Sequence, residues 1–132
     1  VGAGAGFPAL PLKIIYPHLH VILIEVKRKK GMFLEALVDA LGLCNVEIID
    51  LDWRTFLRTT QFDIDLFVTR AALDDLEICR MFRQNCFYKK EMLVYWGTSD
   101  WQPHPKNEKY VKKVEDYKLG KRDRKLFFFK SS

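Results

Sequence analysis

The sequence predicts an α/β fold in which a doubly wound, mostly parallel sheet ends in a C-terminal antiparallel hairpin. Two observations predict it. Short apolar runs alternate with segments of helical periodicity along the chain. The chain begins with a glycine-rich turn, Gly2-Ala3-Gly4-Ala5-Gly6. Sheets of this class bind ligands at the carboxyl ends of their strands, so we expect a binding site at that edge.

The first half of the chain predicts three helices and two strands. Pro8 and Pro11 are compatible with the first helix because both fall in or near its first turn. Gly42 ends the second helix as a C-cap. In order, we expect a helix at 7–16, a strand at 20–26, a helix at 27–41, a strand at 46–52 and a short helix at 53–58. The apolar face of the second helix comprises Phe33, Leu34, Leu37, Val38 and Leu41.

The second half predicts two further strands, one helix and the hairpin. Asp74 and Asp75 favour a helix start, and apolar residues follow at helical spacing as far as Cys86. The loop over 98–108 separates the parallel part from the hairpin. We expect strands at 64–69, 92–96, 110–119 and 125–130, the last two joined by a turn at 120–123.

Composition indicates a single domain with a basic C-terminal part. The 132 residues are 48% hydrophobic and 30% charged, which is ordinary for a globular protein, and no apolar run is long enough for a membrane helix. Residues 104–132 carry ten Lys/Arg against four Asp/Glu, which fits a polyanionic partner such as RNA as well as it fits solvated strands. The three cysteines have no CxxC spacing, so we expect reduced, mostly buried thiols of a cytoplasmic protein.

Four groups of residues fall at the same predicted edge: 2–7, 25–27, 52–54 and Arg70. Gly2, Gly4 and Gly6 allow a ligand to approach the backbone. Glu25 ends an apolar strand, where a carboxylate can accept hydrogen bonds from both hydroxyls of a ribose. The pattern therefore predicts one site for a nucleoside cofactor.

Short motifs follow one another in a characteristic order. They are 1–8 with Pro11-Leu12, Glu25-Val26, Lys29-Lys30 with Phe33-Leu34, Asn45-Val46-Glu47, Asp65 with Thr69-Arg70-Ala71, Tyr117-Lys118-Leu119 and Arg124-Lys125-Leu126. In this order they resemble the ribosomal RNA small subunit methyltransferase G family, also called glucose-inhibited division protein B. The resemblance extends over nearly the whole chain.

The resemblance implies a class I S-adenosylmethionine-dependent methyltransferase, Rossmann-like in fold. Residues 1–132 would then be a single methyltransferase domain without the family's N-terminal helical segment and first strand. That strand would lie between the strands expected at 20–26 and 64–69. The implied reaction transfers a methyl group to N7 of a guanine in small-subunit (16S) ribosomal RNA. This nitrogen has a lone pair and no proton to remove, so the reaction needs no general base.

The resemblance also implies site residues. Gly2 and Phe7 would contact the cofactor, Trp53 and Arg54 would form its adenine side, and Arg70 would belong to the same site. We expect Arg70, Lys29 and Lys30 to contact the RNA. The basic run at 27–30 opens a helix, where the dipole disfavours cations, and this unfavourable placement suggests that an anion lies nearby. The partner is thus ribosomal RNA, with no metal and no membrane, and we expect a monomer.

Alternatives exist for individual residues and for the function. Arg70 could instead form a salt bridge with Asp65 or Asp74, and Trp53 could cover the core. The enzyme could methylate another substrate. A non-catalytic RNA-binding relative is a further alternative, because the residues at Asp52 and Trp96 depart from the family pattern.

Overall fold

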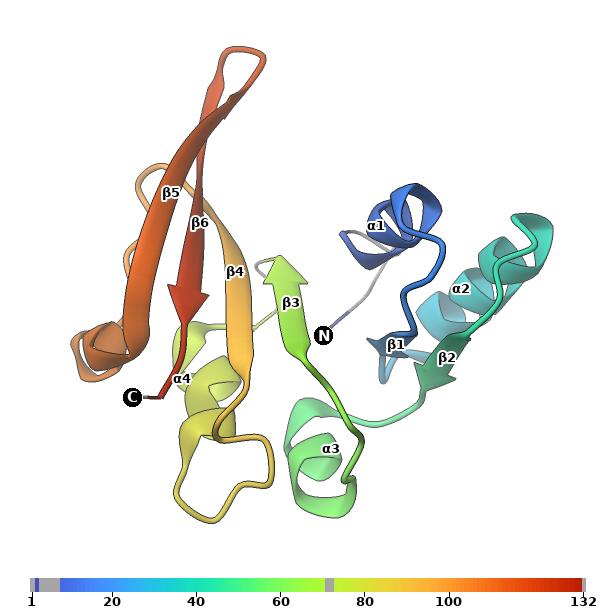
Figure 1. Ribbon diagram of the computed structural model, residues 1–132, viewed down its shortest axis with the longest axis horizontal. Helices are drawn as coiled ribbons and strands as arrows, with labels where there is room; N and C mark the ends of the chain where they lie inside the picture. Colours follow the sequence, from blue (N-terminus) through green and yellow to red (C-terminus); the bar gives the residue numbers. More distant parts are fainter. Residues whose placement is uncertain (1, 3–7, 71–72, 132) are drawn as a thin grey trace.

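The computed structural model describes residue 2 and residues 8–70 and 73–131 (Figure 1). Strands and helices alternate along the chain as the sequence predicts. None of the helices in these ranges is long and apolar enough to cross a membrane. The described strands form two separate sheets, one of two strands and one of four.

The two-stranded sheet belongs to the first third of the chain. Strand β1 pairs with β2 in parallel, with Val21 opposite Val46. Helices α1 and α2 complete this region, and Leu10, Leu23, Leu34 and Val38 form its small core. Its elements are α1 (Ala9–Ile15), β1 (Val21–Ile24), α2 (Arg28–Ala40) and β2 (Val46–Ile49).

The four-stranded sheet has the order β3-β4-β6-β5. Strands β3 and β4 are parallel, whereas β6 runs antiparallel to both β4 and β5. The elements are α3 (Trp53–Thr59), β3 (Leu66–Arg70), α4 (Asp75–Ile78), the 3-10 helix η1 (Cys79–Phe82), β4 (Met92–Thr98), the 3-10 helix η2 (Pro105–Tyr110), β5 (Val111–Leu119) and β6 (Arg122–Phe129).

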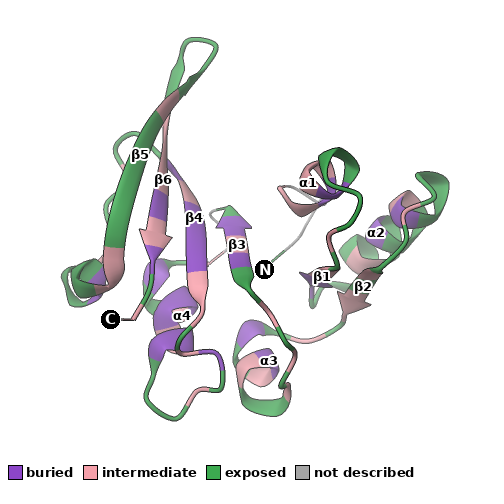
Figure 2. Ribbon diagram, viewed as in Figure 1, coloured by how far each residue is buried: buried purple, intermediate pink, exposed green. Residues whose placement is uncertain are grey.

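One face of the larger sheet packs into the main core. Buried residues are concentrated on β3, β4, β6 and α4, while most of β5 is exposed (Figure 2). Trp53 and Phe56 of α3 pack on this face, where Phe56 stacks on Tyr88 with ring centroids 5.5 Å apart. The residues that the sheet contributes are Phe67, Leu93, Tyr95, Phe127 and Phe129.

The single doubly wound sheet of the prediction is thus divided in two. Within the described residues β1 and β3 do not pair with each other. The family resemblance places the family's first strand at this position. Phe33 and Leu41, predicted on the buried face of α2, are 52% and 47% exposed.

Several predicted boundaries need correction. The helix expected to reach Cys86 ends at Phe82, because α4 is a single turn that continues only as η1. The loop predicted over 98–108 contains the start of η2. The hairpin turn is Gly120-Lys121 rather than 120–123, since a glycine with a φ of 64° allows a two-residue turn. Cys44 is exposed, contrary to the expectation of mostly buried thiols.

Candidate functional site

A cavity of about 460 Å³ lies at the carboxyl ends of β1, β2 and β3. All four groups of residues that the sequence places at this edge contribute to it. Its size is typical of sites for small molecules and cofactors. The lining residues are Gly2, Ile24, Glu25, Val26, Lys27, Lys30, Leu51, Asp52, Trp53, Arg70 and Leu73.

Glu25 is the buried acid of this cavity. Its backbone N–H donates to the carbonyl of Ile49 at 3.1 Å, so the residue continues the β1–β2 pairing by one step. The side chain is 6% exposed, and one carboxylate oxygen accepts the backbone N–H of Lys27 at 3.3 Å. The carboxylate is thus held beside the cavity by the strand end and by the start of α2.

Gly2 has a φ of 58°, in the left-handed region that side-chain-bearing residues rarely adopt. A glycine at this position therefore matches the backbone conformation, and it lies in the cavity wall. The other predicted members of the turn, Gly4, Gly6 and Phe7, lie outside the described residues.

Trp53 forms part of the cavity wall, but its ring is held by the core. The side chain is 5% exposed and stacks on Phe56 with an interplanar angle of 7°. The indole N–H is shared between the carbonyls of Glu77 at 3.1 Å and Ile78 at 3.3 Å. Of the two interpretations of Trp53, this packing favours core cover.

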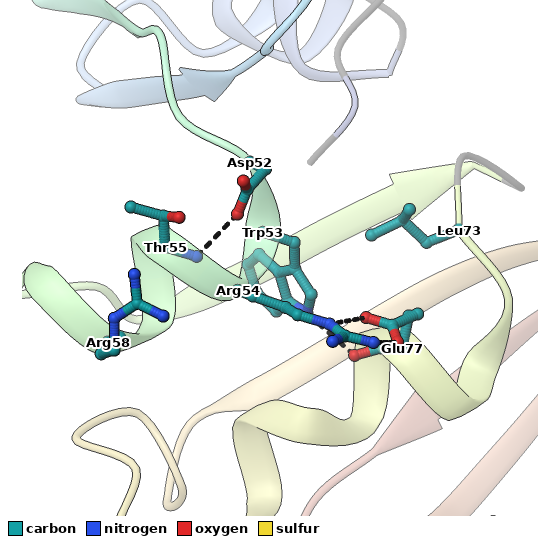
Figure 3. A pocket seen from close by; sticks show the side chains of 7 residues that line it. All are labelled: Asp52, Trp53, Arg54, Thr55, Arg58, Leu73 and Glu77. Carbon is teal, nitrogen blue, oxygen red and sulfur yellow. Dashed lines mark hydrogen bonds and ion pairs between the residues drawn. The ribbon is translucent and has the colours of Figure 1, made fainter.

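Arg54 lines a second, smaller cavity of about 370 Å³, which shares Asp52 and Trp53 with the larger one (Figure 3). Its Nε donates to a Glu77 oxygen at 2.9 Å, and a terminal nitrogen binds the other oxygen. The hydrogen bond from Arg54, assisted by Arg80, holds the pKa of Glu77 at about 2. The structure therefore separates the predicted pair, because Arg54 does not line the larger cavity.

The three predicted RNA contacts are divided in the same way. Arg70 ends β3, is exposed and lines the larger cavity. Lys30, in the first turn of α2, also lines it, whereas Lys29 beside it does not. Arg70 and Lys30 thus place cationic side chains around a cavity that contains the Glu25 carboxylate.

The sequence interpretation did not select Asp52 as a binding residue. Asp52 lines both cavities and caps α3 by accepting the backbone N–H of Thr55 at 2.7 Å. This hydrogen bond lowers the pKa of the Asp52 carboxyl. Its position three residues after the end of β2, at the sheet edge where Glu25 follows β1, was the available signal.

A buried polar cluster supports the segment that follows β3. Asp75 accepts the backbone N–H of His104 at 2.8 Å and the side-chain amide of Asn107 at 2.6 Å. The Tyr95 hydroxyl donates to the carbonyl of Leu73 at 3.3 Å. Leu73 is thereby held at the cavity wall. Sequence spacing contains no signal for these contacts, which join residues 22 to 32 positions apart.

No group of three or more potential metal ligands is found within residue 2 and residues 8–70 and 73–131. The described cysteines form no disulfide. Burial raises the pKa of the Cys79 thiol to about 12, so this thiol is a structural residue and not a reactive one.

Residues 1–124 match the sequence profile of a family described as "GidB: rRNA small subunit methyltransferase G". This chain belongs to that family. Among its curated relatives, the rRNA small subunit methyltransferase G of Helicobacter hepaticus is 36% identical over 107 residues, which are 80% of this chain and 57% of the relative. That of Bacillus velezensis is 44% identical over 74 residues, 54% of this chain and 31% of the relative. The chain thus covers less than two thirds of the length of either relative.

Solved structures show the same fold at low sequence identity. The methyltransferase domain of METTL16 superimposes with a TM-score of 0.72 at 13% identity, covering 98% of this chain and 57% of that one. A putative methyltransferase from Escherichia coli, yhhF, gives 0.64 at 14% identity and covers 98% and 73%. TrmK from M. capricolum, solved with S-adenosyl-homocysteine, gives 0.66 at 11% identity and covers 98% and 59%. The fold of this family member is therefore that of a class I methyltransferase, Rossmann-like, as the family resemblance implies.

Proposed function

We propose that this chain provides the cofactor site of an S-adenosylmethionine-dependent rRNA methyltransferase. The observation that supports the proposal most directly is the cavity at the carboxyl edge, where Gly2, Glu25 and Arg70 meet in a member of this family. We further propose N7 of a guanine in small-subunit (16S) rRNA as the acceptor atom.

Glu25 is suited to the ribose of the cofactor. A buried carboxylate can accept hydrogen bonds from two adjacent hydroxyls, and bonds to a charged acceptor are stronger than bonds to a neutral one. Apolar side chains of Ile24, Leu51 and Leu73 supply walls for the flat, weakly polar adenine. Gly2 lets the cofactor approach the backbone.

The bound cofactor supplies the methyl group, and the protein has to align it with the acceptor. Methyl transfer from a sulfonium is an in-line displacement, so positioning is the main requirement. The N7 lone pair needs no base to expose it, and so the site can work without an acid–base pair. Arg70 would position the nucleotide by donating to guanine O6 or to a phosphate.

The environment and assembly of the protein are part of the same proposal. Free cysteines fit a reducing compartment, and we place the protein in the cytoplasm. We propose that it acts as a monomer on the RNA.

The experiment compares Glu25→Gln with Glu47→Gln. Both remove one negative charge, but Glu47 is an exposed β2 residue paired with His20. Calorimetry should show a tenfold to hundredfold loss of S-adenosylmethionine affinity in the first variant, about 1.5–3 kcal/mol, and none in the second. Equal affinities would contradict the role of Glu25.

Labelled methyl transfer to small-subunit rRNA tests the substrate. RNA that contains 7-deazaguanine at the target has no N7 lone pair and should accept no label. Cofactor binding without transfer to the unmodified small-subunit rRNA would favour a methyltransferase of another substrate. Absence of cofactor binding would favour the non-catalytic relative.

A further inference from the structure

The β5–β6 hairpin extends beyond the carboxyl ends of β3 and β4 (Figure 1). Strand β4 ends at Thr98, which lies opposite Arg124 of β6. The residues from Lys118 of β5 round the turn to Asp123 of β6 therefore reach past the main sheet. They project from the same edge as the cavity that Arg70 lines.

The strand register divides the hairpin side chains between two faces. Arg70 lies opposite Trp96, and Thr98, two residues further along β4, lies opposite Arg124. Paired residues share a face, and so do residues two apart on a strand. Arg124 and Arg122 thus lie on the same sheet face as Arg70.

The charges on the two faces differ. On the Arg70 face, Arg122 is opposite Leu119 and Arg124 is opposite Tyr117, so the outer hairpin has no acid there. Along the two hairpin strands the first acid on this face is Glu115, which forms an ion pair with Lys113 at 2.5 Å. Beyond the end of β4, the Asp100 carboxylate accepts a hydrogen bond from the hydroxyl of Thr98, opposite Arg124, at 2.7 Å.

On the other face, each cation has an acid partner. Lys118 lies opposite Asp123, and Lys125 is 4.0 Å from Asp116. The two positive and two negative charges of these four residues therefore cancel. The net positive charge of the outer strands is therefore concentrated on the face that Arg70 shares.

We propose that Arg122 and Arg124 form a phosphate-binding strip for the RNA that flanks the target nucleotide. The inference rests on the proposed function. Arg124 lies two strands across from Arg70, at about 4.8 Å per strand, and two residues further along, at about 3.4 Å per residue. The Cα atoms of the two arginines are therefore roughly 12 Å apart. This separation suits the backbone a few nucleotides from the reacting base.

RNA fits this surface better than an acidic protein does. Leu119 is the one large apolar side chain exposed at the described hairpin tip, and protein interfaces depend on a buried apolar centre. Binding to RNA needs mainly cations that neutralise phosphates. The narrow major groove of an RNA helix excludes a β-ribbon, so the contacts would be to the backbone and independent of sequence.

The test compares two double variants with the same change in net charge. One is Arg122→Gln with Arg124→Gln, and the matched control is Lys118→Gln with Lys125→Gln on the other face. Binding of a small-subunit rRNA fragment is measured across a salt series, and S-adenosylmethionine affinity is measured alongside. We expect the arginine variant to bind RNA about tenfold to thirtyfold more weakly, with a salt slope reduced by one to two, at unchanged cofactor affinity.

The control should lose less than about threefold in RNA affinity. Equal losses in the two variants would show an effect of net charge alone and would overturn the strip. Unchanged RNA binding in the arginine variant would overturn it as well and would direct attention to an acidic protein partner. The variant Arg122→Lys with Arg124→Lys keeps both positive charges and should bind RNA much as the parent protein does. This result would show that the glutamine variant loses affinity through lost charge and not through misfolding. If the parent protein binds cofactor but no rRNA, the proposed function itself fails.

Discussion

The two-stranded sheet and the four-stranded sheet each form one wall of the cavity, but their cores differ greatly. Four aliphatic residues form the small core of the first, whereas thirteen residues, most of them aromatic or large, form the main core beside the second, to which β1 contributes Ile24. Among the described residues, seven of the twelve exposed large apolar side chains belong to residues 14–41, in the smaller region. The carboxylate proposed to bind the cofactor thus lies in the region with less buried apolar surface.

This difference indicates where stability and binding reside. Buried apolar area is the main favourable contribution to folding, so the larger sheet should remain folded when the smaller one opens. Ligand contacts from both walls would then stabilise the smaller region by mass action.

Phe56→Ala should have the largest effect. Phe56 is fully buried and contacts Trp53, Phe67 and Tyr88, so its truncation leaves a large cavity in the main core. We expect a loss of about 3–5 kcal/mol in the free energy of unfolding, measured by denaturant titration. Phe33→Ala removes the same ring from an exposed position and should cost less than about 0.5 kcal/mol. Similar losses in both variants would contradict the assignment of the core.

Leu34→Ala should cost about 2–3 kcal/mol and should act locally. Leu34 is fully buried in the small core under β1 and β2. Amide hydrogen exchange should show faster exchange in these two strands, while β4 and β6 keep their protection. Equal loss of protection in both sheets would mean that the two regions unfold as one unit.

Glu77→Gln should have the smallest effect, about 1 kcal/mol at pH 7, because the Arg54 side chain is 58% exposed and water screens the pair. Arg54 holds the pKa of Glu77 at about 2, below its ordinary value of 4.5. The stabilisation is therefore complete above about pH 4.5 and is lost as the pH falls towards 2. Denaturant titrations of both proteins at pH 7 and pH 2.5 measure it. A difference that persists at low pH would have another origin.

Local sequence patterns predicted most elements correctly because each carries its own signal. The alternation of apolar runs and helical spacing identified the parallel strands, and Gly42, with its φ of 61°, ends α2 as predicted. Predicted bounds of short elements were wrong where the sequence signal was weak. The apolar spacing up to Cys86 could not show that the helix would end at Phe82.

The gathering of Gly2, Glu25 and Arg70 at one edge followed from the sequence alone, because parallel strands place their carboxyl ends together. The roles of Trp53 and Arg54 did not. The indole of Trp53 packs in the core and donates to the carbonyl of Glu77. Arg54 binds the carboxylate of Glu77, which is distant in sequence, and does not line the larger cavity. Only the tertiary structure could decide these contacts, since they depend on which helix packs beside α3. The same holds for the hairpin, where the excess of positive charge is visible in the sequence but the face that carries it is set by strand register.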